Sequence, residues 1–344
     1  MDASQSLPAR PLAALPKAHL HLHLVGSMRP ATLRDLAARE GSAVPRALAT
    51  GLAEGPVGWA RFDELYSAAK DLVRRPGDLV RLVRELAEDE AAAGSGWVEV
   101  TANPALYQGR FGPPAAVLEL LLDAAQAATA RTGVGIGWVV SADRRHPDQA
   151  PSLARLARRY VDRGVVGFGL ANDERANPAA PFAEAFRLAS VGGLRAVPHA
   201  GELCGPQAVA HAVDQLGATR VGHGVRAVED PALLERLAAA GTHFEICPTS
   251  NLALGVYAMA GEHPLPQLLA AGCSVSLGAD DPLLFGTGLV GQYALAREEL
   301  GLGDDVLAEL ARSSWRASCA PSDRVRAGTA AIDAWEGRTA ALAA

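Results

Sequence analysis

Short apolar runs alternate with longer helical segments along most of this chain of 344 residues, and this alternation constrains the fold more than any other feature. The runs have the length and side chains of buried strands. They are Ala18–Leu24, Gly96–Thr101, Val134–Ser141, Val165–Leu170, Ala196–Ala200, Val221–Gly224, His243–Cys247 and Ser274–Leu277. The helical segments include Asp78–Ala93, Pro113–Thr132, Ala150–Arg163, Phe182–Leu188 and Pro231–Ala240. Strands that are each followed by a helix predict an α/β fold, a closed parallel (β/α)8 TIM barrel.

The chain is long enough for a barrel with additions. Such barrels commonly contain ~250 residues or more in one unit. No linker or low-complexity tract divides the chain, so we predict a single domain over residues 1–344. The segment Ala31–Asp78 is too long for one crossover between the first two strands. We therefore expect extra helices there, which form a lid over the barrel mouth.

Charge and cysteine content exclude several classes of function. A formal net charge of -6 argues against general affinity for nucleic acid or an anionic membrane. No apolar stretch is long enough to span a bilayer, and residues 1–16 lack the regions of a signal peptide. The cysteines are widely spaced and have the pattern of reduced thiols. We therefore expect a cytoplasmic protein whose partner is a small molecule, and its oligomeric state is open.

Metal-binding side chains lie on the first predicted strand. His21 and His23 form a His-x-His pair, and their imidazoles share one face because alternate side chains of a strand point the same way. Taken alone, such a pair is weak evidence for a metal. However, His19 continues the alternation, and three histidines on one short strand are hard to explain by packing.

Three later segments place a histidine or a carboxylate at strand ends. His199 is followed by a glycine and Glu202, and the alternative is a helix N-terminus capped by Glu202. His223 lies between glycines, which allow the backbone to approach a ligand closely, and the alternative is a turn histidine. Asp280 and Asp281 follow the last run, where adjacent carboxylates point in opposite directions; the alternative is an Asp-rich turn.

Together these segments predict a hydrolytic metal centre. A catalytic Zn²⁺ needs neutral imidazoles, a hard carboxylate and an open position for water. The residues that offer such groups are His21, His23, His199, His223 and Asp280. Because the ends of barrel strands meet at one rim, we expect these groups to converge around one Zn²⁺ per chain. Iron or manganese would also suit a site of nitrogen and oxygen donors.

At these residues the chain resembles the adenosine deaminase family of the amidohydrolase superfamily. The resemblance extends from Leu15 to Trp335, with the motifs in family order and at family-like spacing. The motifs are PKAHLHLHL (16–24), HAGE (199–202), RVGHG (220–224), EICPTSN (245–251) and LGADDP (277–282). The resemblance implies hydrolytic deamination of a 6-aminopurine nucleoside, adenosine or a 5′-modified adenosine, to the 6-oxopurine nucleoside and ammonia.

The resemblance also implies a role for each site residue. The implied zinc ligands are His21, His23, His199 and Asp280. His223 is implied to hold and deprotonate the hydrolytic water. Glu202 is implied to protonate N1 of the purine, so we expect a dry pocket to raise its pKa. Asp281 is implied to accept a hydrogen bond in the ring-nitrogen region.

Further positions are implied as substrate contacts or departures from the family. Asn172 replaces the glycine of the family's Ala-Gly-Asp-Glu, and its backbone N–H is expected to contact the purine. Phe62, Leu65 and Tyr66 either form an apolar lid over the base or belong to the core. His19 replaces the family's glutamate before Leu-His-x-His, and we expect it beside the metal ligands rather than among them.

Val25 stands where typical family members have an aspartate that accepts a hydrogen bond from the ribose 5′-hydroxyl. A valine cannot accept this bond, and a buried unpaired hydroxyl costs about 1–3 kcal/mol. We therefore hypothesise that the substrate lacks a free 5′-hydroxyl and that Val25 packs against a 5′ extension. The alternatives are a 6-aminodeoxyfutalosine deaminase of the futalosine menaquinone pathway, or an adenine deaminase.

Two other classes of function are disfavoured. An amidase or phosphoesterase on the same scaffold does not need Glu202 and Asp281, which suit a protonatable aromatic ring. A non-catalytic nucleoside-binding protein would be expected to lose a ligand or the acid, whereas all the expected positions are filled. The sequence also lacks the paired H-x-E and P-C-x-x-C motifs of cytidine-deaminase-type enzymes.

Overall fold

The structure is a computed structural model that describes residues 10–44, 48 and 57–337. Residues 45–47 and 49–56, which belong to the segment predicted to form a lid, lie outside the described residues. The chain ends 1–9 and 338–344 also lie outside them. The prediction of a single domain over residues 1–344 therefore stays a prediction.

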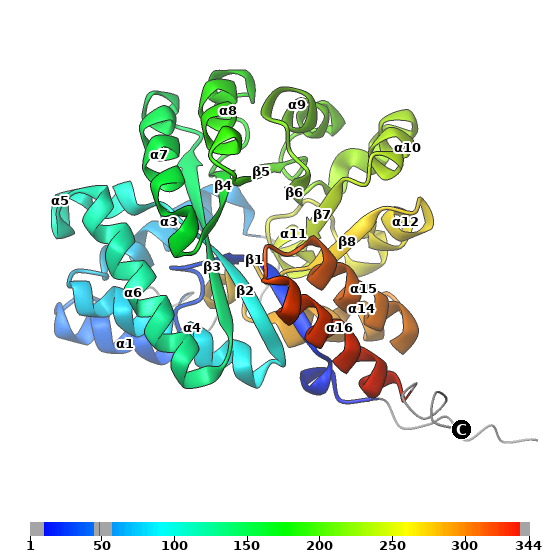
Figure 1. The fold of residues 1–344 in the computed structure, drawn as a ribbon, viewed down its shortest axis with the longest axis horizontal. Coiled ribbons are helices and arrows are strands. Elements are labelled where there is room, and N and C mark those ends of the chain that lie inside the picture. The colour runs from blue at the N-terminus through cyan, green and yellow to red at the C-terminus, as the bar shows by residue number, and fades with distance from the viewer. Residues whose placement is uncertain (1–9, 45–47, 49–56, 338–344) are drawn as a thin grey trace, which may run out of the picture.

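A parallel eight-stranded sheet lies at the centre of the molecule, and its strands follow the order of the sequence (Figure 1). The strands are β1 (Lys17–His23), β2 (Ser95–Ala102), β3 (Gly135–Asp143), β4 (Val165–Ala171), β5 (Arg195–Ala200), β6 (Arg220–His223), β7 (His243–Ile246) and β8 (Ser274–Leu277). Each predicted apolar run coincides with one strand to within two residues at either end. The predicted (β/α)8 barrel is confirmed.

The barrel closes where β1 meets the segment that follows β8. The backbone N–H of Asp280 donates to the carbonyl of His21 (3.1 Å), and the backbone N–H of His23 donates to the carbonyl of Asp280 (3.0 Å). Helix α15 (Asp304–Ala317) packs against both β1 and β8 and covers this seam from outside (Figure 1). The closure therefore brings both ends of the barrel sequence to one place.

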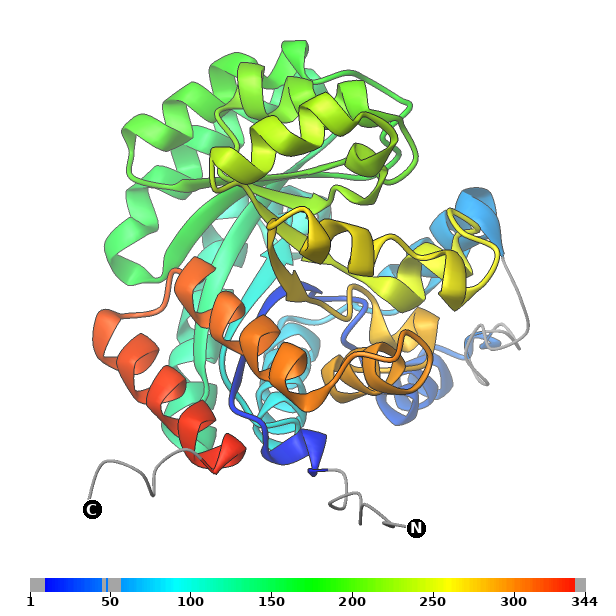
Figure 2. The ribbon, with the colours of Figure 1, turned by 90° about the vertical axis from the view of Figure 1, so that its right-hand side faces the viewer.

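Helices surround the strands on the outside of the barrel (Figure 2). The described α-helices are α1 (Pro30–Arg39), α3 (Gly58–Asp71), α4 (Pro76–Ala92), α5 (Gln108–Phe111), α6 (Pro114–Thr132), α7 (Ala150–Ala157), α8 (Ala183–Val191), α9 (Pro206–Leu216), α10 (Pro231–Ala239), α11 (Pro248–Ala253), α12 (Leu265–Ala270), α13 (Pro282–Phe285), α14 (Leu289–Glu298), α15 (Asp304–Ala317) and α16 (Ser322–Glu336). Many begin with proline, whose missing N–H costs nothing in the first turn. None of the described helices has both the length and the apolar character to cross a membrane.

One predicted helix is divided. Instead of a single helix over Ala150–Arg163, α7 ends at Ala157 and the chain continues as a 3₁₀ helix over Arg158–Arg163. Tyr160 leaves the helical region at φ -119°, and Gly164 at φ 114° then allows the turn into β4. The periodicity did not reveal this break because short 3₁₀ turns at the end of an α-helix keep a similar apolar spacing.

The strands are buried on both faces, as expected of parallel strands covered by helices. Every residue of β3 is buried. On β4, the ring of Phe168 is fully buried and meets the ring of Phe186 of α8 edge-on, with centroids 5.1 Å apart. This contact joins the sheet to its helical layer.

We predict that Phe168→Ala lowers the free energy of unfolding by about 3–5 kcal/mol, because it leaves a cavity between β4 and α8. Val191→Ala, at a residue of α8 that is 71% exposed, is the matched control and should change stability by at most about 0.5 kcal/mol. Urea denaturation followed by circular dichroism measures both. Equal stabilities of the two variants would contradict the packing of Phe168 against α8.

Candidate active site and metal centre

A cavity opens at the carboxyl ends of the barrel strands, beside α3. It is lined by His23, Trp59, Phe62, Asp63, Tyr66, Thr101, Ala102, Asn103, Leu106, Ser141, Ala142, Asp143, Ala171, Asn172, His199, Glu202, His223, Leu254, Asp280 and Asp281. Active sites of (β/α)8 enzymes occupy this end of the barrel. The sequence motifs therefore meet in the expected part of the fold.

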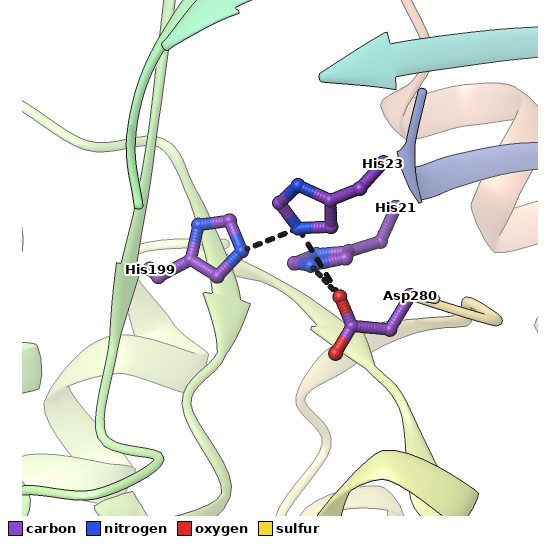
Figure 3. Close-up of side chains that lie close together, drawn as sticks. All are labelled: His21, His23, His199 and Asp280. Carbon is purple, nitrogen blue, oxygen red and sulfur yellow. Dashed lines mark hydrogen bonds and ion pairs between the residues drawn. The ribbon is translucent and has the colours of Figure 1, made fainter. Parts of the chain in front are cut away.

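The predicted zinc ligands converge on one point (Figure 3). One donor atom of each lies within 4.8 Å of the others, and the residues are His21, His23, His199 and Asp280. The Nε2 atoms of His23 and His199 are 3.1 Å apart. Oδ1 of Asp280 lies 3.1 Å from Nε2 of His23 and 3.4 Å from Nε2 of His21. Donors at about 2.0 Å from a tetrahedral Zn²⁺ are about 3.3 Å apart, so this spacing fits the ion.

The charges of the side chains at this site also favour the binding of a cation. Burial lowers the pKa of His21, but Asp280 and Glu245 more than offset it and raise this pKa to about 10. Burial likewise opposes ionisation of Asp280, but His21 and His23 hold the pKa of its carboxyl well below the usual range. The carboxylates therefore stabilise positive charge at the point where the donor atoms meet, which a divalent cation would supply.

Glu245 of β7 fixes the ring of His21. Nδ1–H of His21 donates to Oε2 of Glu245 (3.0 Å), which leaves Nε2 free to face the other ligands. Arg220 donates to Oε1 of Glu245 (2.7 Å) and to Oε2 of Glu99 (2.7 Å), and all three charged side chains are buried. Burial raises the pKa of Glu245, but Arg220 and His21 lower it overall to about 2. Sequence reasoning missed this support, because no spacing rule links Glu245 to His21.

His19 lies beside the ligand cluster, as expected, and not among the converging donor atoms. Its Nε2 accepts the backbone N–H of Ala279 (2.9 Å), so Nδ1 carries the proton and donates to Oε1 of Glu90 (2.8 Å). Since Ala279 immediately precedes Asp280, His19 anchors the backbone that carries the carboxylate ligand.

Three described residues other than glycine have a left-handed backbone: Asn172 (φ 84°), His223 (φ 60°) and Asp280 (φ 60°). All three line the cavity. Such conformations are uncommon for residues with a side chain, and they cluster at functional sites. They also explain why the family's glycine suits position 172, where asparagine tolerates this conformation better than most residues.

A glycine makes room for the imidazoles. A Cβ added at Gly222 would lie 2.8 Å from Cε1 of His21 and 3.3 Å from Cγ of His199. The glycine that precedes His223 therefore lets the backbone of β6 approach the ligand cluster, as the sequence predicts.

The predicted acid and base residues face the same cavity. Nε2 of His223 lies 3.5 Å from Oε1 of Glu202. Burial, together with the charges of Asp280 and Glu174, raises the pKa of Glu202 well above its usual range, in the direction expected of a dry pocket. Burial lowers the pKa of His223 to about 3, so the imidazole is neutral. Burial and Asp280 also raise the pKa of Asp281 well above its usual range.

The predicted substrate contacts divide into two groups. Asn172, Phe62 and Tyr66 line the cavity. Phe62 also packs in parallel against Phe285, with ring centroids 5.4 Å apart, so it takes part in the core as well. Val25 is 3% exposed in the hydrophobic core, and it is not among the described residues that line the cavity. Its contact with a substrate stays a prediction.

Part of the cavity rim was missed by sequence reasoning. Asp143 accepts hydrogen bonds from Arg145 (2.8 Å) and from Nδ2 of Asn172 (3.2 Å). Arg145 also lies 3.6 Å from Asp63 of α3, so it connects the end of β3 to this extra helix. The predicted strand ended at Ser141, two residues too early, which hid Asp143 from the list of strand-end residues. Helix α3 borders the cavity, and its role as a lid stays a prediction.

A (β/α)8 barrel that gathers three histidines and an aspartate at its carboxyl end has the architecture of a metal-dependent hydrolase. Residues 16–335 match the family model of adenosine deaminase, and the chain belongs to the adenosine deaminase family. The membership agrees with the resemblance that the motifs suggested. The chain is a hydrolytic enzyme of a family that deaminates adenine-type substrates.

Named relatives cover nearly the whole chain. A putative adenosine/adenine deaminase of Streptomyces virginiae is 50% identical over 95% of this chain and 98% of the relative. An aminodeoxyfutalosine deaminase of Streptomyces coelicolor is 37% identical over 89% of this chain and 81% of the relative. An adenine deaminase of Chelativorans is 35% identical over 85% of this chain and 90% of the relative.

Solved structures are similar over the same range. The crystal structure of an adenine deaminase from Arthrobacter aurescens is 26% identical, with a TM-score of 0.86, over 96% of this chain and all of that one. An amidohydrolase from Burkholderia ambifaria, whose crystal structure contains bound Zn, is 27% identical, with a TM-score of 0.86, over 98% of this chain and 97% of that one.

We predict that Glu245→Gln weakens zinc binding about 10–100-fold, because the variant loses the charge that orients His21 and makes it a better ligand. Competition with a chromogenic chelator measures the affinity. Glu229→Gln is the matched control, since Glu229 pairs with Arg226 at an exposed position and should leave the affinity unchanged. Equal zinc affinity of both variants and the wild type would exclude a role of Glu245 in metal binding.

Proposed function

We propose that this protein hydrolyses the 6-amino group of an adenine nucleoside, adenosine or a 5′-modified adenosine, and releases ammonia and the 6-oxopurine nucleoside. The observation that carries the proposal is the convergence of three imidazoles and Asp280 beside a buried Glu202 whose pKa is raised. Membership of the adenosine deaminase family and the names of the relatives support it.

The donor set fits one Zn²⁺ per chain. The residues proposed to hold it are His21, His23, His199 and Asp280. When bound, the ion supplies the Lewis acidity that makes water a nucleophile near neutral pH. The related amidohydrolase that contains Zn supports this metal. Iron and manganese remain alternatives in the cell, because availability and geometry decide occupancy at such sites.

The other side chains of the site move protons and orient the purine. Glu202 donates a proton to N1 of the purine, which makes the adjacent C6 more electrophilic. Neutral His223 holds the attacking water and takes its proton. Asp281 hydrogen-bonds in the region of the ring nitrogens and fixes the orientation of the base. The backbone N–H of Asn172, another residue that lines the cavity, contacts the purine.

The cavity favours an uncharged substrate. Its acidic lining residues are Asp63, Asp143, Glu202, Asp280 and Asp281. Within the described part of the chain, neither lysine nor arginine is among the lining residues. Arg145, near the rim, is already paired with Asp143 and Asp63. A phosphate entering this cavity would lose hydration without gaining a bond from lysine or arginine, so a nucleoside or a base suits the site better than a nucleotide.

A second candidate is a 5′-extended adenosine such as aminodeoxyfutalosine. The replacement of the family's ribose-binding aspartate by Val25 favours it, and so do the aminodeoxyfutalosine deaminases among the relatives. Free adenine is the third candidate, because adenine deaminases are 34–35% identical to this chain.

We also propose that the enzyme works in the cytoplasm. Its four cysteines are free in the structure, in keeping with a reducing compartment. Its net charge of -6 disfavours nucleic acid as a partner, which leaves the small-molecule purine.

The first test is ammonia release by the zinc-loaded protein from adenosine, 5′-deoxyadenosine, aminodeoxyfutalosine, adenine and AMP. We expect turnover of at least one uncharged adenine compound, with kcat/KM at least about 100-fold above that of AMP, which corresponds to the loss of one charge-pairing interaction. A clear preference for adenosine over 5′-deoxyadenosine would contradict the hypothesis drawn from Val25. If none of these compounds releases ammonia, the proposed function is contradicted.

The second test is the acid role of Glu202. Because its protonated form is the active one, we expect kcat/KM to be full below the raised pKa of Glu202 and to fall as the pH rises through that pKa. Glu202→Gln should lower kcat by about 10²–10⁴-fold and leave the zinc content unchanged. Steady-state kinetics across the pH range, with metal analysis of each variant, measures both. A variant with wild-type kcat would remove Glu202 from the mechanism.

A further inference from the structure

Glu174, in the loop after β4, binds four consecutive backbone amides of another loop. Its Oε1 accepts the N–H of Gly201 (2.6 Å), and its Oε2 accepts the N–H groups of Glu202 (3.1 Å), Leu203 (2.8 Å) and Cys204 (2.8 Å). The side chain is buried, with 5% of the residue exposed. The bonds span 27–30 residues of sequence, so they are tertiary contacts and not part of a local turn.

The loop that Glu174 binds contains one site residue and directly follows another. It follows Ala200, the last residue of β5, directly after the predicted zinc ligand His199, and it contains Glu202. Gly201, at φ 72°, turns the chain between them. The segment 201–204 is neither helix nor strand, so its N–H groups have no ladder to join. Buried amides need partners, and here one carboxylate provides all four.

A second buried side chain holds the start of the same loop. Arg144 donates to the carbonyl of His199 (2.6 Å) and to the carbonyl of Asn177 (2.7 Å), and 2% of it is exposed. The side chain of Asn177 returns a hydrogen bond to the carbonyl of Arg144 (2.8 Å). Arg144 also interacts electrostatically with Glu174. The loop is therefore bound by a cation at the carbonyl end of β5 and by an anion at the amides that follow.

We propose that Glu174 is a positioning residue for deamination: its carboxylate gathers the amides of Gly201–Cys204 and thereby aims the side chain of Glu202 at the substrate. The inference rests on the proposed role of Glu202 as the proton donor. Charge-assisted bonds to a carboxylate are about twice as strong as neutral ones, and four of them converge on one group here. A displacement of about 1 Å at a catalytic group costs about 100-fold in rate, so this restraint acts on kcat.

The test compares Glu174→Gln with the wild type on whichever adenine compound the wild type deaminates. Glutamine keeps the shape of the side chain, but its NH₂ group faces amides that also donate. One bond is lost if the NH₂ group takes the place of Oε1, and three are lost if it takes the place of Oε2. We expect kcat to fall about 10–100-fold, KM to change less than about threefold, and the zinc content to stay at the wild-type level.

The pH profile separates positioning from a general loss of structure. The charge of Glu174 contributes to the raised pKa of Glu202. In Glu174→Gln the fall of kcat/KM at high pH should therefore move to lower pH. Asp173→Asn is the matched control, because the partly exposed side chain of Asp173 binds the exposed Arg175, so this variant should keep both kcat and the profile.

Unchanged kcat in Glu174→Gln would overturn the proposal. A loss of activity matched by an equal loss of zinc or of folded protein, with an unmoved pH profile, would also overturn it. If this variant does not fold, Glu174→Asp decides, since it keeps the charge and withdraws the carboxylate by one methylene. The proposal then expects a reduced kcat at unchanged zinc content, and wild-type kcat would overturn it. A wild-type protein that deaminates no adenine compound would refute the proposed function itself, which is a different result.

Discussion

The backbone hydrogen bonds between β1 and the segment after β8 hold together both the barrel and its site. Asp280 bonds through its N–H to His21 and through its carbonyl to His23, so the seam is closed by the residues that offer donor atoms to a metal. The first and last strands of the barrel therefore cannot separate without dispersing these donors. His19 strengthens the same seam through Ala279, directly before Asp280.

Paired buried charges support the predicted metal ligand His21. Arg220 lies between Glu99 and Glu245, and Glu245 in turn holds His21. Removing Arg220 would leave Glu99 and Glu245 buried without the cation between them, and breaking a buried ion pair in this way is strongly destabilising. Through Glu245, this network links the orientation of the His21 imidazole to the buried guanidinium of Arg220. The geometry of the predicted metal ligands therefore depends on residues that do not line the cavity.

The carboxyl groups that line the cavity have different pKa values because their surroundings differ. Histidines hold the pKa of Asp280 low, whereas burial and neighbouring negative charge raise the pKa of Glu202 and of Asp281. Such a separation lets one cavity contain both a ligand for a cation and an acid that donates a proton. It arises from packing, because the carboxyl groups of aspartate and glutamate have similar pKa values in water.

The sequence by itself determined the barrel and most of the candidate site. Apolar runs of strand length repeat in chain order, and alternation along β1 puts His21 and His23 on one face, so both could be predicted without knowing any contact. Only the tertiary structure decided which remote groups support them. The pairing of His21 with Glu245 spans 224 residues, and the burial of Val25 in the core depends on its packing neighbours. Local periodicity reports which face of a strand or helix is buried, but it cannot report what the closed barrel brings against that face.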